Sequence, residues 1–172
     1  FLARRSLDLG PGGGDNSFGV GLPRVYSFID APVGYPLYSF IEEFFARGIT
    51  VGCGSDGNGQ RRFCPEQALP RRGMATFLIR VLGESPFNNP TPTFEDVPPT
   101  DPGYGFIERA FQLGLTNGCF EDPVTGVRRY CPDAPIMRQG MAAFIVRAKG
   151  WTPLQSPSPR FTDVPTSHPF YG

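Results

Sequence analysis

Four short segments of the chain carry apolar residues at the spacing of an amphipathic helix. In chain order they are Tyr38, Ile41, Phe44 and Phe45; Met74, Phe77, Leu78 and Val81; Phe106, Ile107, Ala110 and Phe111; and Met141, Phe144, Ile145 and Ala148. A glycine follows each segment, at Gly48, Gly83, Gly114 and Gly150. Glycine is favoured just past a helix C-terminus. The pattern predicts short helices joined by long, turn-rich loops, in a fold that is mainly α.

These segments belong to an ordered set of motifs that occurs twice. Phe28-Ile29-Asp30-Ala31-Pro32 recurs as Phe94-Glu95-Asp96-Val97-Pro98, Phe40-Ile41-Glu42 as Phe106-Ile107-Glu108, Gly48-Ile49-Thr50-Val51-Gly52-Cys53 as Gly114-Leu115-Thr116-Asn117-Gly118-Cys119, Phe63-Cys64-Pro65 as Tyr130-Cys131-Pro132, and Arg71-Arg72-Gly73-Met74-Ala75-Thr76-Phe77 as Arg138-Gln139-Gly140-Met141-Ala142-Ala143-Phe144. The offset is 66 residues, and 67 after one insertion between the cysteines. Short helices are marginal alone in water, so each pair must pack on its neighbours, as in repeat arrays.

The motifs divide the chain into four parts. Repeats are expected at residues 26–90 and 91–157, and a third copy of the opening motif, Phe161-Thr162-Asp163-Val164-Pro165, starts an incomplete repeat at 158–172. Residues 1–25 form an extended arm or linker with a flexible Pro11-Gly12-Gly13-Gly14 hinge. Apolar residues alternate from Ser17 to Leu22. A local loop, an arm that docks on a neighbouring copy and the tail of an upstream domain are the alternatives for this segment.

Composition narrows the class of protein. Gly (22) and Pro (20) make up nearly a quarter of the 172 residues, but 16 Phe are too much apolar surface for a disordered chain. The 16 basic and 16 acidic residues balance, and no basic stripe alternates with stacking aromatics, so nucleic acid is not an expected partner. No apolar run approaches the ~20 residues of a membrane helix.

The four cysteines occupy the same positions in both repeats. Of the three possible pairings, the repeat symmetry favours Cys53–Cys64 and Cys119–Cys131. Disulfides of this kind indicate an oxidising, extracellular compartment. A zinc site is disfavoured because there is no Cys-x-x-Cys and only one histidine. Ser55-Asp56-Gly57-Asn58-Gly59 is either a calcium loop or a polar turn, and a turn is favoured since carboxylates are few. No metal or cofactor is expected.

Taken together, these motifs resemble the S-layer homology family, in its cysteine-containing bacterial form. The resemblance covers about residues 25–172 and implies an α-helical, pseudo-threefold bundle of three repeats whose grooves bind an anionic cell-wall polysaccharide. It places Arg71, Arg138, Gly52 and Gly118 at that glycan. This chain keeps neither the Thr nor the Glu of the family's Thr-Arg-Ala-Glu-like motif. The alternative for the two arginines is a surface position or an ion pair with Glu66 or Asp133.

No catalytic group is evident. His168 has no nucleophile or orienting acid in the repeat pattern, and Asp30, Asp96 and Asp163 recur once per repeat, as turn-capping residues do. The favoured function is a non-enzymatic, extracellular structural protein that self-assembles by repeat–repeat packing into a cell-surface layer, sheath or filament, as a homo-oligomer or polymer. One alternative is an anchor module that binds cell-wall polysaccharide. Another is the non-catalytic tail of a secreted hydrolase.

Overall fold

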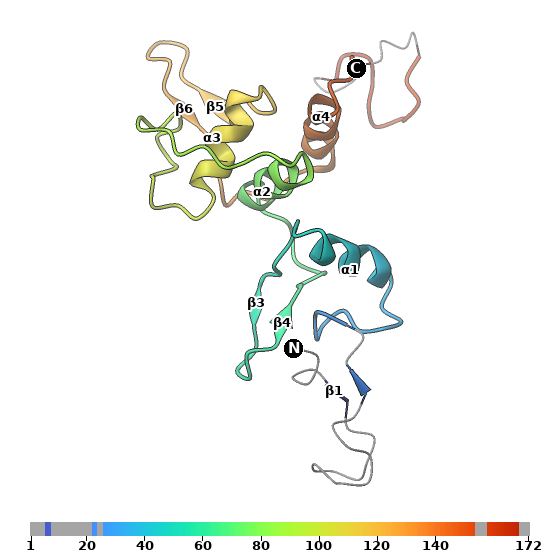
Figure 1. Cartoon of the computed structure of the whole chain (residues 1–172). Coiled ribbons are helices and arrows are strands. Elements are labelled where there is room, and N and C mark those ends of the chain that lie inside the picture. The colour runs from blue at the N-terminus through green and yellow to red at the C-terminus, as the bar shows by residue number, and fades with distance from the viewer. Residues whose placement is uncertain (1–5, 8–21, 24–25, 154–157, 169–172) are drawn as a thin grey trace. The chain divides into compact units, whose positions relative to one another are not determined.

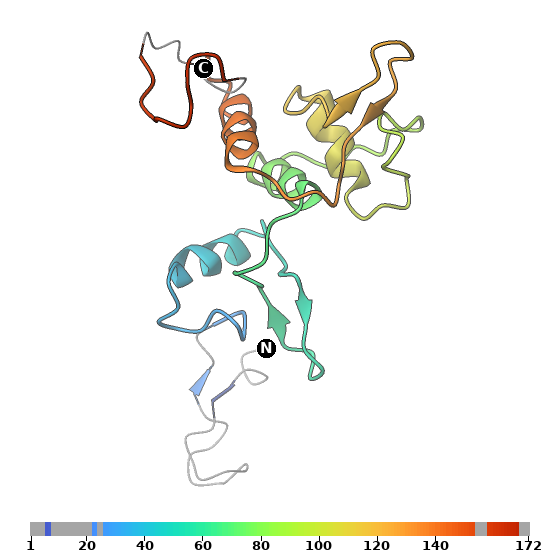
Figure 2. The same cartoon turned by 180° about the vertical axis from the view of Figure 1, so that it is seen from behind.

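The computed structural model describes residues 6–7, 22–23, 26–153 and 158–168. Figures 1 and 2 show the chain from opposite sides. Within the described residues the elements, in chain order, are β1 (Ser6–Leu7), β2 (Leu22–Pro23), α1 (Tyr38–Ala46), β3 (Gly54–Ser55), β4 (Arg61–Arg62), α2 (Arg71–Val81), α3 (Tyr104–Gln112), β5 (Phe120–Glu121), β6 (Arg128–Arg129) and α4 (Arg138–Ala148). The chain divides into a first unit, Phe1–Gln67, and a second unit, Ala68–Gly172. The second helix of the first sequence repeat therefore belongs to the second unit.

The prediction of a mainly α fold is wrong. The helices in the described part of the chain are only nine or eleven residues long. Less than a third of the described residues lie in helices. The loops between the cysteines are not irregular: β3 pairs antiparallel with β4, and β5 with β6. These hairpins depend on turn residues and a disulfide instead of apolar alternation, so hydrophobic periodicity does not detect them.

The ends of the four helices are where the glycine pattern predicts. Each helix stops two residues before its glycine: Ala46 precedes Gly48, Val81 precedes Gly83, Gln112 precedes Gly114, and Ala148 precedes Gly150. None of the helices in the described part of the chain is long and apolar enough to span a membrane.

Near the N-terminus, β1 pairs antiparallel with β2, with Ser6 opposite Pro23 and Leu7 opposite Leu22. The Pro11–Gly14 hinge and the alternating residues before Leu22 lie outside the described residues.

The core of the first unit forms around the fully buried ring of Phe28, in one cluster with the buried Ala31 and Ile41. Phe45 and Phe63 each lie with ring centroids 5.4 Å from that of Phe28. The opening motif, α1 and the aromatic-Cys-Pro segment thus converge on one side chain. This is the small apolar cluster of a repeat that has no second helix within its unit.

The core of the second unit is larger because two more helices contribute to it. α2 packs against α3 and also contacts α4, and Figures 1 and 2 show it between those two helices. Phe94, equivalent to Phe28, lies 5.5 Å from the ring of Phe111 and 5.4 Å from that of Tyr130. The second helix of one sequence repeat therefore completes the core of the next repeat.

Both disulfides favoured by the repeat symmetry are present, Cys53–Cys64 and Cys119–Cys131. Replacing Cys119 and Cys131 together with serine is expected to lower the free energy of unfolding of the second unit by about 3 kcal/mol, because the loop-closure entropy of the unfolded chain is restored. Urea denaturation followed by circular dichroism measures the loss. The matched double replacement of Cys53 and Cys64 should weaken the first unit equally. No change in either variant would contradict a stabilising role.

Candidate functional site

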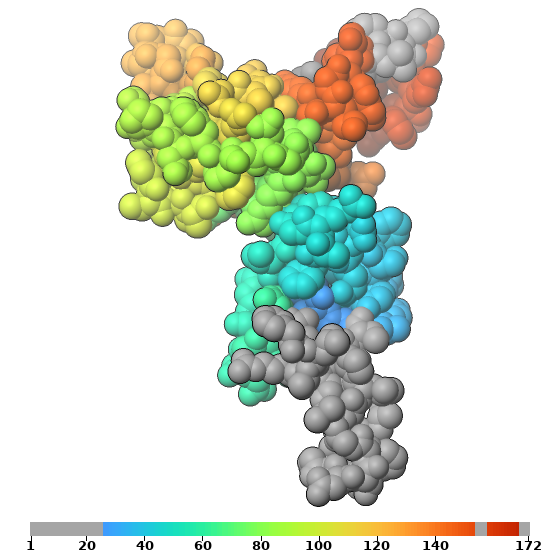
Figure 3. Space-filling model, in the orientation of Figure 1, coloured from blue at the N-terminus to red at the C-terminus, as the bar shows by residue number. Residues whose placement is uncertain are grey.

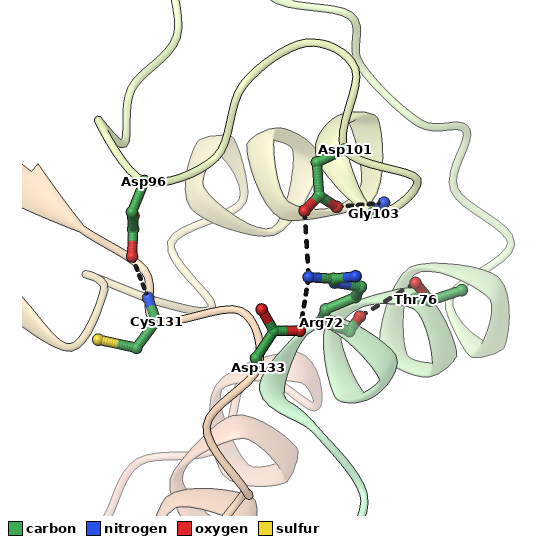
Figure 4. Close-up of polar contacts among 7 residues, drawn as sticks. All are labelled: Arg72, Thr76, Asp96, Asp101, Gly103, Cys131 and Asp133. Atoms are coloured by element: carbon green, nitrogen blue, oxygen red, sulfur yellow. Dashed lines mark hydrogen bonds and ion pairs between the residues drawn. The ribbon is translucent and has the colours of Figure 1, made fainter.

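In the two complete repeats, the aspartate of the opening motif binds the aromatic-Cys-Pro segment of its own repeat. The backbone N–H of Cys131 donates to Asp96 at 2.7 Å (Figure 4), and the backbone N–H of Tyr130 donates to the same carboxylate at 2.8 Å. Equivalent bonds run from Phe63 and Cys64 to Asp30, at 2.7 and 2.8 Å. Hydrogen bonds from a backbone N–H to a carboxylate are stronger than those between two neutral groups. The aspartates hold each cysteine loop against the aromatic core, whereas Asp163 is exposed.

The side chain of Arg71 packs against aromatic residues inside the second unit. Its Nε donates to the carbonyl of Tyr130 at 2.9 Å, and the Tyr130 hydroxyl donates to the carbonyl of Arg71 at 2.9 Å. The guanidinium carbon lies 4.8 Å from the ring centroid of Tyr130 and 5.7 Å from that of Phe144. A guanidinium over aromatic faces gains from their quadrupoles. Among the described residues its buried Nη2 atom has no hydrogen-bond partner.

This arrangement predicts a stability loss at high pH. Burial raises the pKa of Tyr130 to about 12, against the opposing effect of the Arg71 charge. The folded state then keeps the phenol proton while an unfolded tyrosine, with a pKa near 10.0, releases it. Stability from this group is complete below pH ~10 and is lost as pH rises through ~12, by about 2 to 3 kcal/mol.

Denaturation curves between these pH values test the prediction. Tyr130→Phe, which installs the residue found at position 63, should remove most of this pH dependence. It should also cost about 1 kcal/mol at neutral pH, through the lost hydroxyl hydrogen bond. An unchanged slope in the variant would assign the alkaline loss to other tyrosines.

Arg72, next in the chain, is an ion-pair centre (Figure 4). Its Nη2 donates to Asp133 at 2.7 Å and lies 3.2 Å from Asp101. The other oxygen of Asp101 accepts the Gly103 N–H at 2.7 Å, at the start of α3. Asp133 is therefore occupied by Arg72 and not by Arg71. Glu66, which stands at the same position of the first repeat as Asp133 does in the second, accepts a hydrogen bond from the Tyr35 hydroxyl at 2.6 Å.

Gly52 and Gly118 lie against backbone and core. The N–H of Gly118 donates to the buried hydroxyl oxygen of Thr116 at 3.1 Å, and Gly52 repeats this with Thr50 at 3.0 Å. A Cβ at Gly118 would come within 2.4 Å of the Arg129 carbonyl oxygen. Both glycines thus have a packing role in addition to any glycan role.

The Ser55–Gly59 segment forms a polar turn. Asp56 accepts the N–H groups of Asn58 and Gln60 at 2.9 and 2.8 Å. Its carboxylate closes the β3–β4 hairpin in the way that an Asx turn does. The described residues contain no group of three or more His, Cys, Asp or Glu side chains suited to a metal ion.

The positions of Arg71 and Arg138 are equivalent in sequence but not in environment. Arg138 is exposed at the first residue of α4, and the preceding residue, Met137, makes no side-chain capping bond. Figure 3 shows the orange surface of α4 beside the green surface of α2. Sequence reasoning missed this difference, since both helices carry the same apolar spacing.

Comparison with known proteins finds a distant relative and no matching family. No family model matches it, so the S-layer homology resemblance stays a prediction. The chain is 27% identical over 146 residues to a "Cell surface protein" of Thermoanaerobacter kivui, an alignment that covers 83% of this chain. The chain spans 18% of the length of that relative.

Proposed function

We propose that the chain is a non-enzymatic structural module of an extracellular cell-surface protein, and that its repeats assemble by packing the second helix of one repeat on the first helix of the next. A surface location is supported by the name of the Thermoanaerobacter kivui relative and by two disulfides, which form in oxidising compartments. The duplicated local structure supports an array of repeats at 26–90 and 91–157.

One observation carries this proposal: equivalent helices are covered in one repeat and uncovered in the next. Met74 of α2 is 6% exposed beneath α3, while the equivalent Met141 of α4 is 38% exposed. Leu78 and Ile145 differ in the same way, at 7% and 42%. Uncovered apolar surface that is covered in an equivalent repeat indicates a contact site for a further repeat.

A structural role also agrees with how the acidic groups are used. Asp30, Asp96 and Asp101 each accept backbone N–H groups of the scaffold. Glu108, a buried carboxylate on α3, accepts three hydrogen bonds from the loop that precedes it. We infer that these acids maintain the repeat and do not carry out catalysis.

Electron microscopy and sedimentation velocity of the purified protein test assembly, across salt and calcium concentrations. Oligomers whose average size increases with protein concentration are expected. A monodisperse monomer under every condition would contradict the proposal.

A second candidate function is anchoring to an anionic cell-wall polysaccharide. It is favoured by the exposed Arg138 at an uncapped helix N-terminus, where backbone N–H groups and the helix dipole attract anions. A pull-down with purified cell-wall sacculi should lose binding in Arg138→Ala. The control is Arg47→Ala, an exposed arginine paired with Glu43 on α1. Unchanged binding in Arg138→Ala, or in its combination with Arg71→Ala, would exclude these arginines as the glycan contact.

A further inference from the structure

The packing of α2 against α3 defines an interface whose two halves recur elsewhere in the chain. On α2 the buried face consists of Met74, Ala75, Leu78 and Ile79. These side chains share one apolar cluster with Tyr104, Ile107 and Ala110 of α3. We call the first set the acceptor face. We call Tyr104, Phe106, Ile107 and Ala110 of α3 the donor face.

The acceptor face of α4 is uncovered. At an offset of 67 residues its members are Met141, Ala142, Ile145 and Val146. Three of the four are exposed, and Val146 is half-buried, whereas every equivalent on α2 is buried. The described residues that follow, 158–168, repeat the opening motif but form only turns, and Phe161 there is 69% exposed where Phe94 is fully buried.

Two positions of the donor face of α1, Phe40 and Phe44, are exposed, whereas Ile41, the equivalent of Ile107, is buried in the core of its own unit. Phe40 is equivalent to Phe106 and Phe44 to Ala110, at an offset of 66 residues. Phe40 is 67% exposed, whereas Phe106 is half-buried beneath Arg80 of α2. Phe44 is exposed, although Ala110 is fully buried. The larger Phe44 ring adds apolar area to this face, so a contact here would not be an identical copy of the one between α2 and α3.

For two arginine–aromatic contacts of the second unit, the repeat also supplies an equivalent arginine on α4 and an equivalent aromatic residue in the first unit. Arg80 of α2 lies 5.3 Å over the Phe106 ring, and the equivalent residues are Arg147 of α4 and Phe40 of α1. Within its own chain Arg147 also donates from Nη1 to the Leu115 carbonyl, at 3.2 Å. Arg71 lies over Tyr130, and the equivalents are the exposed Arg138 and the half-buried Phe63.

We propose that α4 of one copy of this chain binds α1 of a second copy, as α2 binds α3 within the chain. The inference rests on the proposed function and names its partner and surface: a second copy, held by Met141 and Ile145 against Phe40 and Phe44, with Arg147 over Phe40 and Arg138 over Phe63. The two faces differ, so the contact is heterologous and leaves one free face at each end. Such a contact extends into an open filament unless its rotation closes a ring.

Two variants test this interface, each with a glutamate in one of its two faces; we call them the half-blocked variants. Ile145→Glu blocks the acceptor face and Phe40→Glu blocks the donor face. Both residues are exposed, so the fold should survive, with circular dichroism as the check. In sedimentation velocity each variant alone should remain a monomer at concentrations up to about a hundredfold above those at which the parent chain associates, because a carboxylate would be buried unpaired. An equimolar mixture should form a 1:1 dimer and nothing larger.

The control is Val124→Glu, at a 91% exposed apolar residue outside both faces, which should assemble like the parent chain. Assembly of either half-blocked variant alone, or no dimer in the mixture, would overturn this interface while leaving assembly by another surface intact. A Phe40→Glu dimer would indicate a symmetric α4–α4 contact. A parent chain that stays monomeric would remove this inference and the proposed assembly together.

Discussion

Replacing Gly118 with alanine is expected to lower the free energy of unfolding of the second unit by about 4 kcal/mol. Gly118 has φ +95°, a region that a Cβ penalises by about 1 to 2 kcal/mol. The new Cβ would also lie 2.4 Å from the Arg129 carbonyl oxygen and 2.9 Å from a ring carbon of Phe94. The first neighbour is backbone and the second is core, so neither can move away without loss of packing, which adds about 1 to 3 kcal/mol.

Gly114→Ala is the matched control for this prediction. Gly114 also has positive φ, +70°, but a Cβ there would meet nothing within 4 Å. It should therefore cost only the backbone term, about 1 to 2 kcal/mol. Urea denaturation measures both variants, with hydrogen exchange of α3 assigning the loss to the second unit. Equal losses would show that close approach at Gly118 is unimportant. A stable Gly118→Ala that no longer binds sacculi would favour a glycan role for this residue.

This close approach gives a physical reason for the Gly-Leu-Thr-x-Gly motif. Gly114 follows the end of α3, Leu115 enters the core, and Thr116 accepts the N–H of Gly118. Gly118 then lets the chain pass against Phe94 of the opening motif. The motif thus encodes the fold of one repeat, whatever else it binds.

The sequence predicts those features that depend on local chemistry. The four helices and their ends follow from apolar spacing and glycine, and the disulfide pairing follows from the duplication. The hairpins are missed because Asp56 and Asp122 close them through side-chain bonds to backbone N–H groups, which leave no hydrophobic pattern.

Tertiary partners are harder to predict than elements. An amphipathic stripe says which face of a helix is buried but not which helix covers it, so α2 and α4 look alike in sequence. The same limit applies to Arg71 and Arg138. One signal was available and unused: Glu42 and Glu108 stand at the same position of an amphipathic helical segment in both repeats, each directly after an isoleucine of the apolar stripe. A charged residue repeated in such a segment indicates a buried polar anchor.

That anchor gives the second large effect, because Glu108→Ala is expected to destabilise the second unit by about 4 kcal/mol. Glu108 is 1% exposed. It accepts the N–H and hydroxyl of Thr93 at 2.8 and 2.7 Å, and the Asn89 side-chain amide at 3.0 Å. Alanine leaves these half-buried donors without their acceptor, and each donor left unsatisfied away from water costs about 1 to 3 kcal/mol. Thr93 precedes the fully buried Phe94, so the loss spreads to the core.

Glu108→Gln separates hydrogen bonding from side-chain volume. The glutamine oxygen can still accept the Thr93 N–H and its amide can donate to the Thr93 hydroxyl, so about half of the stability should return. Glu42→Ala removes the equivalent bonds to Ser27, at 2.5 and 2.7 Å on a less buried residue, and should cost the first unit about 2 kcal/mol. Glu43→Ala, at an exposed pair with Arg47, should cost less than about 0.5 kcal/mol. Denaturation of the four variants ranks them, and equal losses for Glu108→Ala and Glu108→Gln would mean that volume, not hydrogen bonding, sets the effect.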